Sequence, residues 1–188
     1  MAQFPARDVS LTGSLFASLF GWLRRPPVPL DPELWRELRH STALLQALDE
    51  NDAARLQALV AVFLQRKTIT PVAGLELDPQ ARMQLAALCC LPLLGFGVEG
   101  LHGWSQLLVY PEAFRVQRSH VDATGVLHEY EDELIGEAWE SGPLILSWAD
   151  VRADLADPRA GFCVAIHEMA HKLDALDGAM DGTPPLPR

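Results

Sequence analysis

The amino-acid sequence predicts an α+β fold, in which a helical N-terminal layer packs on a small mixed sheet and one further helix carries a metal-binding motif. Three observations lead to this prediction. Apolar residues recur at helical spacing through residues 32–90, and short runs rich in β-branched and aromatic residues follow in residues 106–148. An H-E-x-x-H motif then lies at residues 167–171.

Length and composition indicate a folded chain. It has 188 residues, of which 49% are hydrophobic and 21% charged, which is typical of globular proteins and not of disordered ones. We expect a single domain over residues 31–188, preceded by an N-terminal arm and linker over residues 1–30. The formal net charge of -10 and the lack of a Lys/Arg cluster oppose attraction to phosphate backbones. No nucleic-acid partner is therefore expected.

The N-terminal arm contains an uncharged stretch at residues 9–23. This stretch is shorter than the roughly 20 residues that a membrane-spanning helix needs. The basic residues Arg24 and Arg25 follow it, whereas a signal peptide carries its positive charge before the apolar part. We therefore expect no membrane partner. An interfacial helix is the alternative, because Phe16, Leu19, Phe20 and Leu23 recur at helical spacing.

Three helices are predicted in the first half. Asp31 and a proline at the first helical position favour a helix over residues 32–48. Asn51 or Asp52 would cap a second helix that runs to residue 67. A second Asp-Pro start favours a third helix from residue 79, which is kinked or ended near Pro92 and Gly95. This third helix is apolar nearly all round, so we expect it to be central.

Four strands are predicted in the second half, from the runs "QLLVYP", "AFRVQR", "GVLHEY" and "GPLILSW". The fourth run stands shortly before the motif-bearing helix. We expect that helix to begin between residues 157 and 161 and to continue to about residue 176. Residues 181–188 have the composition of a loop.

The motif "HEMAH" has the spacing of a zinc site. Positions four apart stack on one face of a helix, so His167 and His171 would present their imidazoles to one Zn²⁺ ion. Glu168 sits about 100° around the helix from His167, displaced from the ligand position but placed to reach a zinc-activated water as general base. The sequence therefore favours a zinc site with Glu168 as the catalytic residue. An ordinary surface helix with two histidines is the alternative.

Two aspartates follow the motif. Asp174 lies on the same helical face and could accept the outer N–H of a liganding imidazole, or it could be a solvated acid. Asp177 falls at the last ligand position of the zinc-peptidase pattern H-E-x-x-H-x-x-G-x-x-H, so it is an alternative candidate for the third zinc ligand. The turn in that pattern needs a glycine where this chain has Asp174, and Gly178 comes too late to replace it.

Other potential ligands favour ordinary roles. Cys163 is four residues before His167, but a core thiol is the preferred interpretation. For His102, His120 and His128 we prefer locally bonded or solvated imidazoles. The chain has three cysteines without framework spacing, which predicts free thiols and a cytoplasmic location.

The string "HEMAHKLDALDGAMDGTP" resembles the active-site region of the Mlc titration factor A family of zinc-dependent peptidases. "FLQRKTITPVAGLEL", "ALCCLPLLGFGVEGLHGWSQLLVYPEAF" and "GPLILSWADV" are similar to that family's pattern in the same order. The resemblance implies a cytoplasmic zincin with aminopeptidase-like activity, in which His167 and His171 bind zinc and Glu168 is catalytic. It also implies binding of the transcriptional repressor Mlc.

The family's third ligand is a Glu on a later helix, and this chain stops before that helix. We therefore expect the domain to lack its C-terminal part and the metal site to be incomplete. Two functions follow: a zinc metallopeptidase that hydrolyses peptides, or a protein that sequesters a repressor and keeps a vestigial metal site. For the peptidase, we hypothesise that residues 143–148 form or flank the sheet edge that pairs with an extended peptide. This hypothesis fails if residues 144–147 lie on a central strand that is paired on both sides.

Overall fold

The computed structural model describes residues 28–121, 127–134, 136–138, 142–178 and 180–185. Its helices and strands confirm the α+β class. The helices are α2 (Pro32–Ser41), α3 (Ala43–Gln46), α4 (Glu50–Arg66), α5 (Pro79–Cys90), α6 (Trp148–Ala156) and α7 (Val164–Asp174). The strands are β1 (Thr68–Pro71), β2 (Gln106–Tyr110), β3 (Phe114–Val121), β4 (Leu127–Leu134), β5 (Gly136–Ala138) and β6 (Leu144–Ser147). Short 3₁₀ helices lie at Leu91–Leu94, Gly97–Leu101 and Ala175–Asp177.

Aspartate caps fix the starts of the N-terminal helices. The Asp31 carboxylate accepts hydrogen bonds from the backbone N–H groups of Glu33 and Leu34, as the sequence predicts. The second helix begins earlier than predicted, because the Asp49 carboxylate accepts the N–H of Asp52 at 2.8 Å and so replaces the two expected caps.

The predicted first helix is in fact two helices. Thr42 adopts an extended conformation between α2 and α3, with φ -112° and ψ 109°. The third helix behaves as predicted: Asp78 caps α5 through the N–H of Ala81, and the α-helix passes into a 3₁₀ helix at Leu91, next to Pro92.

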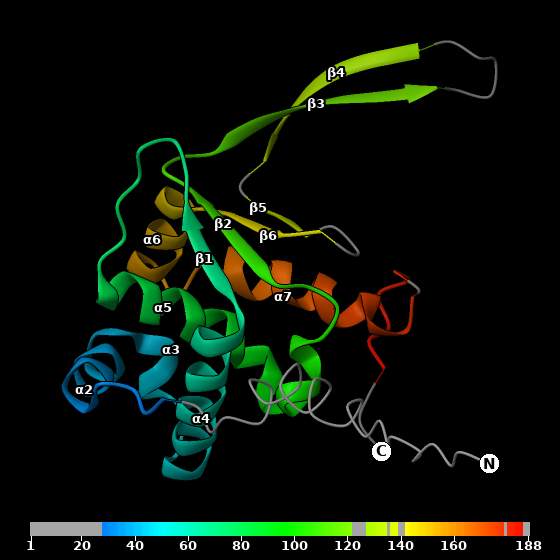
Figure 1. Ribbon diagram of the computed structural model, residues 1–188. Helices are drawn as coiled ribbons and strands as arrows, with labels where there is room; N and C mark the ends of the chain where they lie inside the picture. The colour runs from blue at the N-terminus through cyan, green and yellow to red at the C-terminus, as the bar shows by residue number, and fades with distance from the viewer. Residues whose placement is uncertain (1–27, 122–126, 135, 139–141, 179, 186–188) are drawn as a thin grey trace, which may run out of the picture.

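The main sheet has four strands in the order β1-β2-β6-β5. β1, β2 and β6 run parallel, and β5 pairs antiparallel with β6. β3 and β4 form a separate antiparallel hairpin, which stands apart from the rest of the chain in Figure 1. All four predicted strands are present, but β1 and β5 were not predicted.

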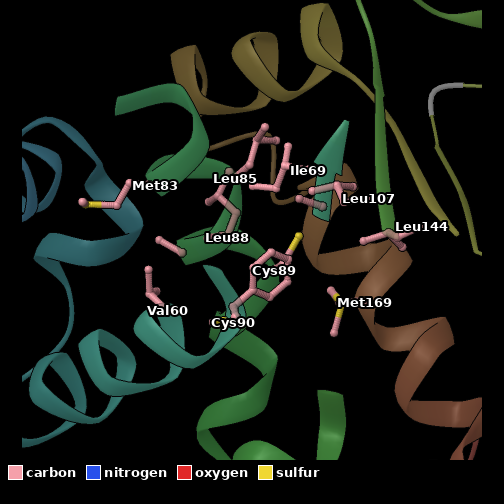
Figure 2. Packing of buried hydrophobic residues seen from close by; sticks show 14 of the residues in the cluster. Val60, Ile69, Met83, Leu85, Leu88, Cys89, Cys90, Leu107, Leu144 and Met169 are labelled. Atoms are coloured by element: carbon pink, nitrogen blue, oxygen red, sulfur yellow. The ribbon is translucent and has the colours of Figure 1, made fainter. Parts of the chain in front are cut away.

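One apolar cluster joins the helical layer to the sheet. Figure 2 shows Cys89 and Cys90 of α5 beside Leu107 of β2, Leu144 of β6 and Met169 of α7. α7 packs against α5, β5 and β6, so the motif-bearing helix lies between the helical layer and the antiparallel edge of the sheet. None of the helices in the described part of the chain combines the length and apolar composition that a membrane span requires.

Candidate metal centre

The motif-bearing helix begins later than the sequence predicts. Residues 157–163 are not helical, and α7 starts at Val164, after Cys163 in an extended conformation. The Asp154 carboxylate, at the end of α6, accepts the backbone N–H of Val164 at 2.7 Å. This acid therefore satisfies the first backbone N–H of α7 from outside the helix.

α7 turns one face into the protein and another toward solvent. Its buried positions form a stripe that consists of Val164, Ala165, Glu168, Met169, Lys172, Leu173 and Asp174. His167 is exposed and His171 is half-buried. The two histidines therefore lie at the border of the buried stripe, where solvent still reaches them, while Glu168 lies inside it.

The two imidazoles converge as a zinc pair requires. The Nε2 atoms of His167 and His171 are 3.1 Å apart, and the ring planes are at 87°. Two nitrogens bound to one tetrahedral zinc ion at about 2.05 Å would lie about 3.4 Å apart. The pair therefore fits two positions of a zinc site. The same distance also allows one ring to donate a hydrogen bond to the other when no metal is bound.

A phenylalanine covers one side of this pair. The ring of Phe162 lies 5.5 Å from that of His167, centre to centre, although Phe162 itself is 43% exposed. The Phe162 ring therefore lies next to one member of the histidine pair and remains accessible to solvent.

Glu168 is buried, with 6% of its surface exposed. One turn further along α7, Lys172 is 3% exposed, and its Nζ donates a hydrogen bond of 2.8 Å to the carbonyl of Gly142. Burial lowers the pKa of Lys172 to about 8, and the charge of Glu168 partly opposes this effect. The buried Glu168 carboxylate is therefore close enough to the Lys172 ammonium for their charges to interact.

The two predicted aspartates occupy different environments. Asp174 is buried, and its Oδ2 accepts the backbone N–H of Gly182 at 3.0 Å, while its Oδ1 has no hydrogen-bond partner among the described residues. Asp177 is exposed, in the 3₁₀ helix that follows α7. The described residues record no bond from either aspartate to the histidine pair.

In the part of the chain that the structure describes, no third ligand accompanies the pair. Within the described residues, no group of three His, Cys, Asp or Glu side chains is placed to hold a metal ion. Cys163 is half-buried, and burial raises its pKa, which disfavours the thiolate that a metal needs. His102 lies against Glu99, with 3.1 Å between Nδ1 and Oε2. The side chains of His120 and His128 lie outside what the structure describes.

The hypothesis that residues 143–148 form the sheet edge is wrong. Leu144, Ile145 and Leu146 of β6 each pair with β2 on one side and with β5 on the other. β5 is the outer strand at this end of the sheet, and it packs against α7. Any peptide that joins the sheet beside the motif would therefore pair with β5.

Sequence reasoning missed the buried surroundings of Lys172. Its ammonium lies 5.7 Å from the centre of the Trp104 ring, and that of Lys67 lies 3.9 Å from the same ring. The sequence does contain one signal that sets these residues apart, because lysine occurs in this chain only at positions 67 and 172.

The chain matches a known family of proteins over most of its length. Residues 22–188 match the family model described as glucose-regulated metallo-peptidase M90. The match includes the whole of α7 and the sheet that packs against it.

Several curated relatives carry the name Mlc titration factor A. The protein from Escherichia fergusonii is 40% identical over 145 residues, which are 77% of this chain and 54% of the relative. The proteins from Escherichia coli O139:H28 and Shigella boydii are each 38% identical over 154 residues, which are 81% of this chain and 57% of the relative. The chain thus spans little more than half the length of the curated relatives that it matches.

Proposed function

The chain belongs to the glucose-regulated metallo-peptidase M90 family, and we propose from this premise that α7 is the active-site helix of a zinc-dependent peptidase with aminopeptidase-like activity. The observation that carries the proposal is the 3.1 Å separation of the His167 and His171 Nε2 atoms, next to a buried Glu168. Two converging imidazoles and an adjacent carboxylate are the parts that metal-assisted hydrolysis of a peptide bond requires.

Each residue has a distinct part in this proposal. His167 and His171 hold the zinc ion, which when bound supplies Lewis-acid polarisation of the scissile carbonyl and acidifies water. Glu168 accepts the proton of the attacking water and then delivers it to the leaving amine. Its burial suits this work, because a general base with few surrounding waters interacts more strongly with the reacting groups.

The sheet beside α7 supports a peptide substrate. β5 lies at the edge of the sheet and packs against α7. An edge strand presents unpaired backbone groups that can hydrogen-bond to an extended peptide irrespective of its sequence. In the proposed complex the peptide lies along β5, with its scissile bond facing the histidine pair.

Exchange of Glu168 for Gln tests the catalytic assignment, because the amide keeps the size of the side chain and loses its basicity. Wild type and Glu168→Gln are compared for zinc content and for hydrolysis of a peptide amide. The proposal expects equal zinc and a loss of hydrolysis of about a hundredfold or more in the variant. Wild-type hydrolysis that persists in Glu168→Gln would remove the residue from the chemistry.

A second function is favoured by a different observation. The described residues supply two metal ligands and no third, and the relatives are named for titration of Mlc. We therefore also propose that the chain binds and sequesters an Mlc-type transcriptional repressor without using the metal. This function expects the double variant His167→Ala/His171→Ala to bind purified Mlc as wild type does. Loss of binding in that variant would tie repressor capture to the metal site.

A cytoplasmic location is part of both proposals. Cys89 and Cys90 are buried free thiols, and Cys163 is a half-buried one. Free thiols are typical of proteins kept in a reducing compartment. Fractionation of cells that express the tagged protein tests this location.

A further inference from the structure

This chain has only two lysines, Lys67 and Lys172, and both are buried. Histidines aside, its other basic side chains are arginines. Lys67 is 6% exposed and Lys172 is 3% exposed. Lysine is among the residues least often buried, because its ammonium loses its hydration. Specific contacts must therefore hold both side chains inside the protein.

Both ammonium groups lie against the indole of Trp104. The Lys67 Nζ is 3.9 Å from the ring centre, and the Lys172 Nζ is 5.7 Å from it. Lys67 also donates hydrogen bonds to the carbonyl of Leu101, at 2.5 Å, and to that of Trp104. The face of a tryptophan attracts cations more strongly than other aromatic rings do, which offsets part of the cost of burial. We call Lys67, Trp104 and Lys172 the lysine–tryptophan cluster.

The cluster joins the active-site helix to the beginnings of three parallel strands. Lys67 lies between α4 and β1, and Trp104 lies two residues before β2. Lys172 extends from α7 and donates its 2.8 Å hydrogen bond to the carbonyl of Gly142, two residues before β6. β1, β2 and β6 are neighbours in the sheet. One buried side chain of α7 is therefore fixed against the same end of the sheet as the other two members.

The chemistry of this contact explains why lysine occurs here in a chain otherwise rich in arginine. A lysine presents a compact ammonium at the end of an apolar stem, which suits one carbonyl acceptor and one ring face. A guanidinium carries five N–H donors in a rigid fork, and it therefore needs more buried acceptors than the compact ammonium does.

The tie to Gly142 bears on the peptide-binding edge. Gly142 leads into β6, and β6 holds β5 through the pairs Glu137↔Ile145 and Ala138↔Leu144. β5 also packs against α7. The position of Gly142 relative to α7 therefore sets the position of the β5 edge relative to the histidine pair.

We propose that Lys172 is a positioning residue: through Gly142 it fixes the β5 edge, where an extended peptide would lie, at a set distance from the metal-ligand face of α7. The peptide part of this inference rests on the proposed peptidase function. The mechanical link between Lys172 and the β5–β6 pair does not depend on that function and is measured separately.

Hydrogen exchange in the full 188-residue chain tests the link. Lys172→Met keeps the apolar stem and removes the donor, so exchange at the amides of residues 136–138 and 144–147 is expected to rise about tenfold or more. The matched control is Leu38→Ala, a cavity variant in α2 that lowers overall stability and leaves the cluster intact. Lys172→Met and Leu38→Ala are compared under conditions in which their free energies of unfolding are equal. Equal exchange of these segments in the two variants would overturn the proposal.

Two further readouts separate a positioning role from a merely structural one. The zinc affinity of Lys172→Met is expected to stay within about threefold of wild type, because the metal ligands are not changed. In the hydrolysis of a peptide amide, KM is expected to rise with little change in kcat. A fall in kcat alone would overturn the positioning role. Absence of hydrolysis in wild type would count against the peptidase function, while hydrogen exchange still decides the link.

A measurement on wild type covers the case in which Lys172→Met does not fold. A chain labelled with ¹⁵N on lysine gives two side-chain ammonium signals, because only two lysines are present. The signal that belongs to Lys172 is expected to exchange slowly with water and to show coupling to a ¹³C-labelled Gly142 carbonyl. An ammonium that exchanges as fast as that of free lysine, without this coupling, would contradict the proposal.

Discussion

The Nε2 atoms of His167 and His171 lie 3.1 Å apart on α7, with their rings nearly perpendicular. The geometry arises from one turn of helix, so no rearrangement of distant segments is needed to form it. His167 is exposed and His171 half-buried, which leaves the pair open to metal from solvent. Metal binding by this chain should therefore depend on both rings.

We expect either His167→Ala or His171→Ala to lower zinc affinity by at least about tenfold. Loss of a residue that only hydrogen-bonds to a metal ligand already lowers affinity by about tenfold or more, and loss of a ligand itself should cost at least as much. Competition with a fluorescent zinc chelator measures this change. His102→Ala is the matched control, because His102 is exposed, is not part of α7 and has its imidazole against Glu99. An equal loss in the control would show that the zinc is bound elsewhere.

The histidine pair could be predicted from the sequence because it depends only on helical spacing. The start of α7 could not be predicted in this way. Its first N–H bonds to Asp154, ten residues before Val164, and only the packing of α6 brings that acid to the helix. Local cap rules consider neighbouring residues and therefore placed the start too early.

The elements missed by sequence reasoning have different causes. β5 reads Gly-Glu-Ala, which has low strand propensity, and it exists through its pairing with β6. α6 carried a usable signal, because Ser147 precedes Asp150 by three residues and accepts its N–H as a helix cap. A third metal ligand could not be predicted from local spacing, because tertiary structure brings such a residue to the pair. The described residues do not supply one.

Gly100 lies where the 3₁₀ helix at Gly97–Leu101 meets α7. A Cβ at this position would come within 2.4 Å of Leu93 Cδ2 and 2.8 Å of Leu173 Cδ2, and both leucines are buried. We expect Gly100→Ala to lower the free energy of unfolding by about 1–3 kcal/mol through overpacking. Urea denaturation measures this loss. Gly95→Ala is the control, since a Cβ at position 95 has no atom within 4 Å; equal effects of the two substitutions would contradict the steric account.

The two carboxylate oxygens of Asp174 differ in their hydrogen bonding. Two roles can therefore be tested separately: a structural role, and the role of orienting an imidazole that the sequence predicts. Oδ2 accepts the N–H of Gly182, so Asp174→Ala is expected to cost about 1 kcal/mol of stability. Oδ1 is buried without a hydrogen-bond partner among the described residues, and the orienting role would have it accept an imidazole N–H. Asp174→Asn should therefore lower zinc affinity by about tenfold. Unchanged zinc affinity in this variant would leave Asp174 with the Gly182 contact alone.

Lys67 should make stability depend on pH in a defined direction. Burial and repulsion by Lys172 and Arg66 lower its pKa in the folded protein to about 8, from an ordinary value of 10.5. Between these values the unfolded chain binds more protons than the folded one, so the contribution of Lys67 to stability improves as the pH rises. Lys67→Met lacks this titration. The difference in free energy of unfolding, wild type minus Lys67→Met, should therefore increase from about pH 8 to about pH 10, by at most about 1.4 kcal/mol per pH unit. Urea denaturation of both proteins across this range measures the difference, and the subtraction removes groups that titrate in both. A difference that is constant or falls with pH would show that Lys67 remains hydrated in the folded protein.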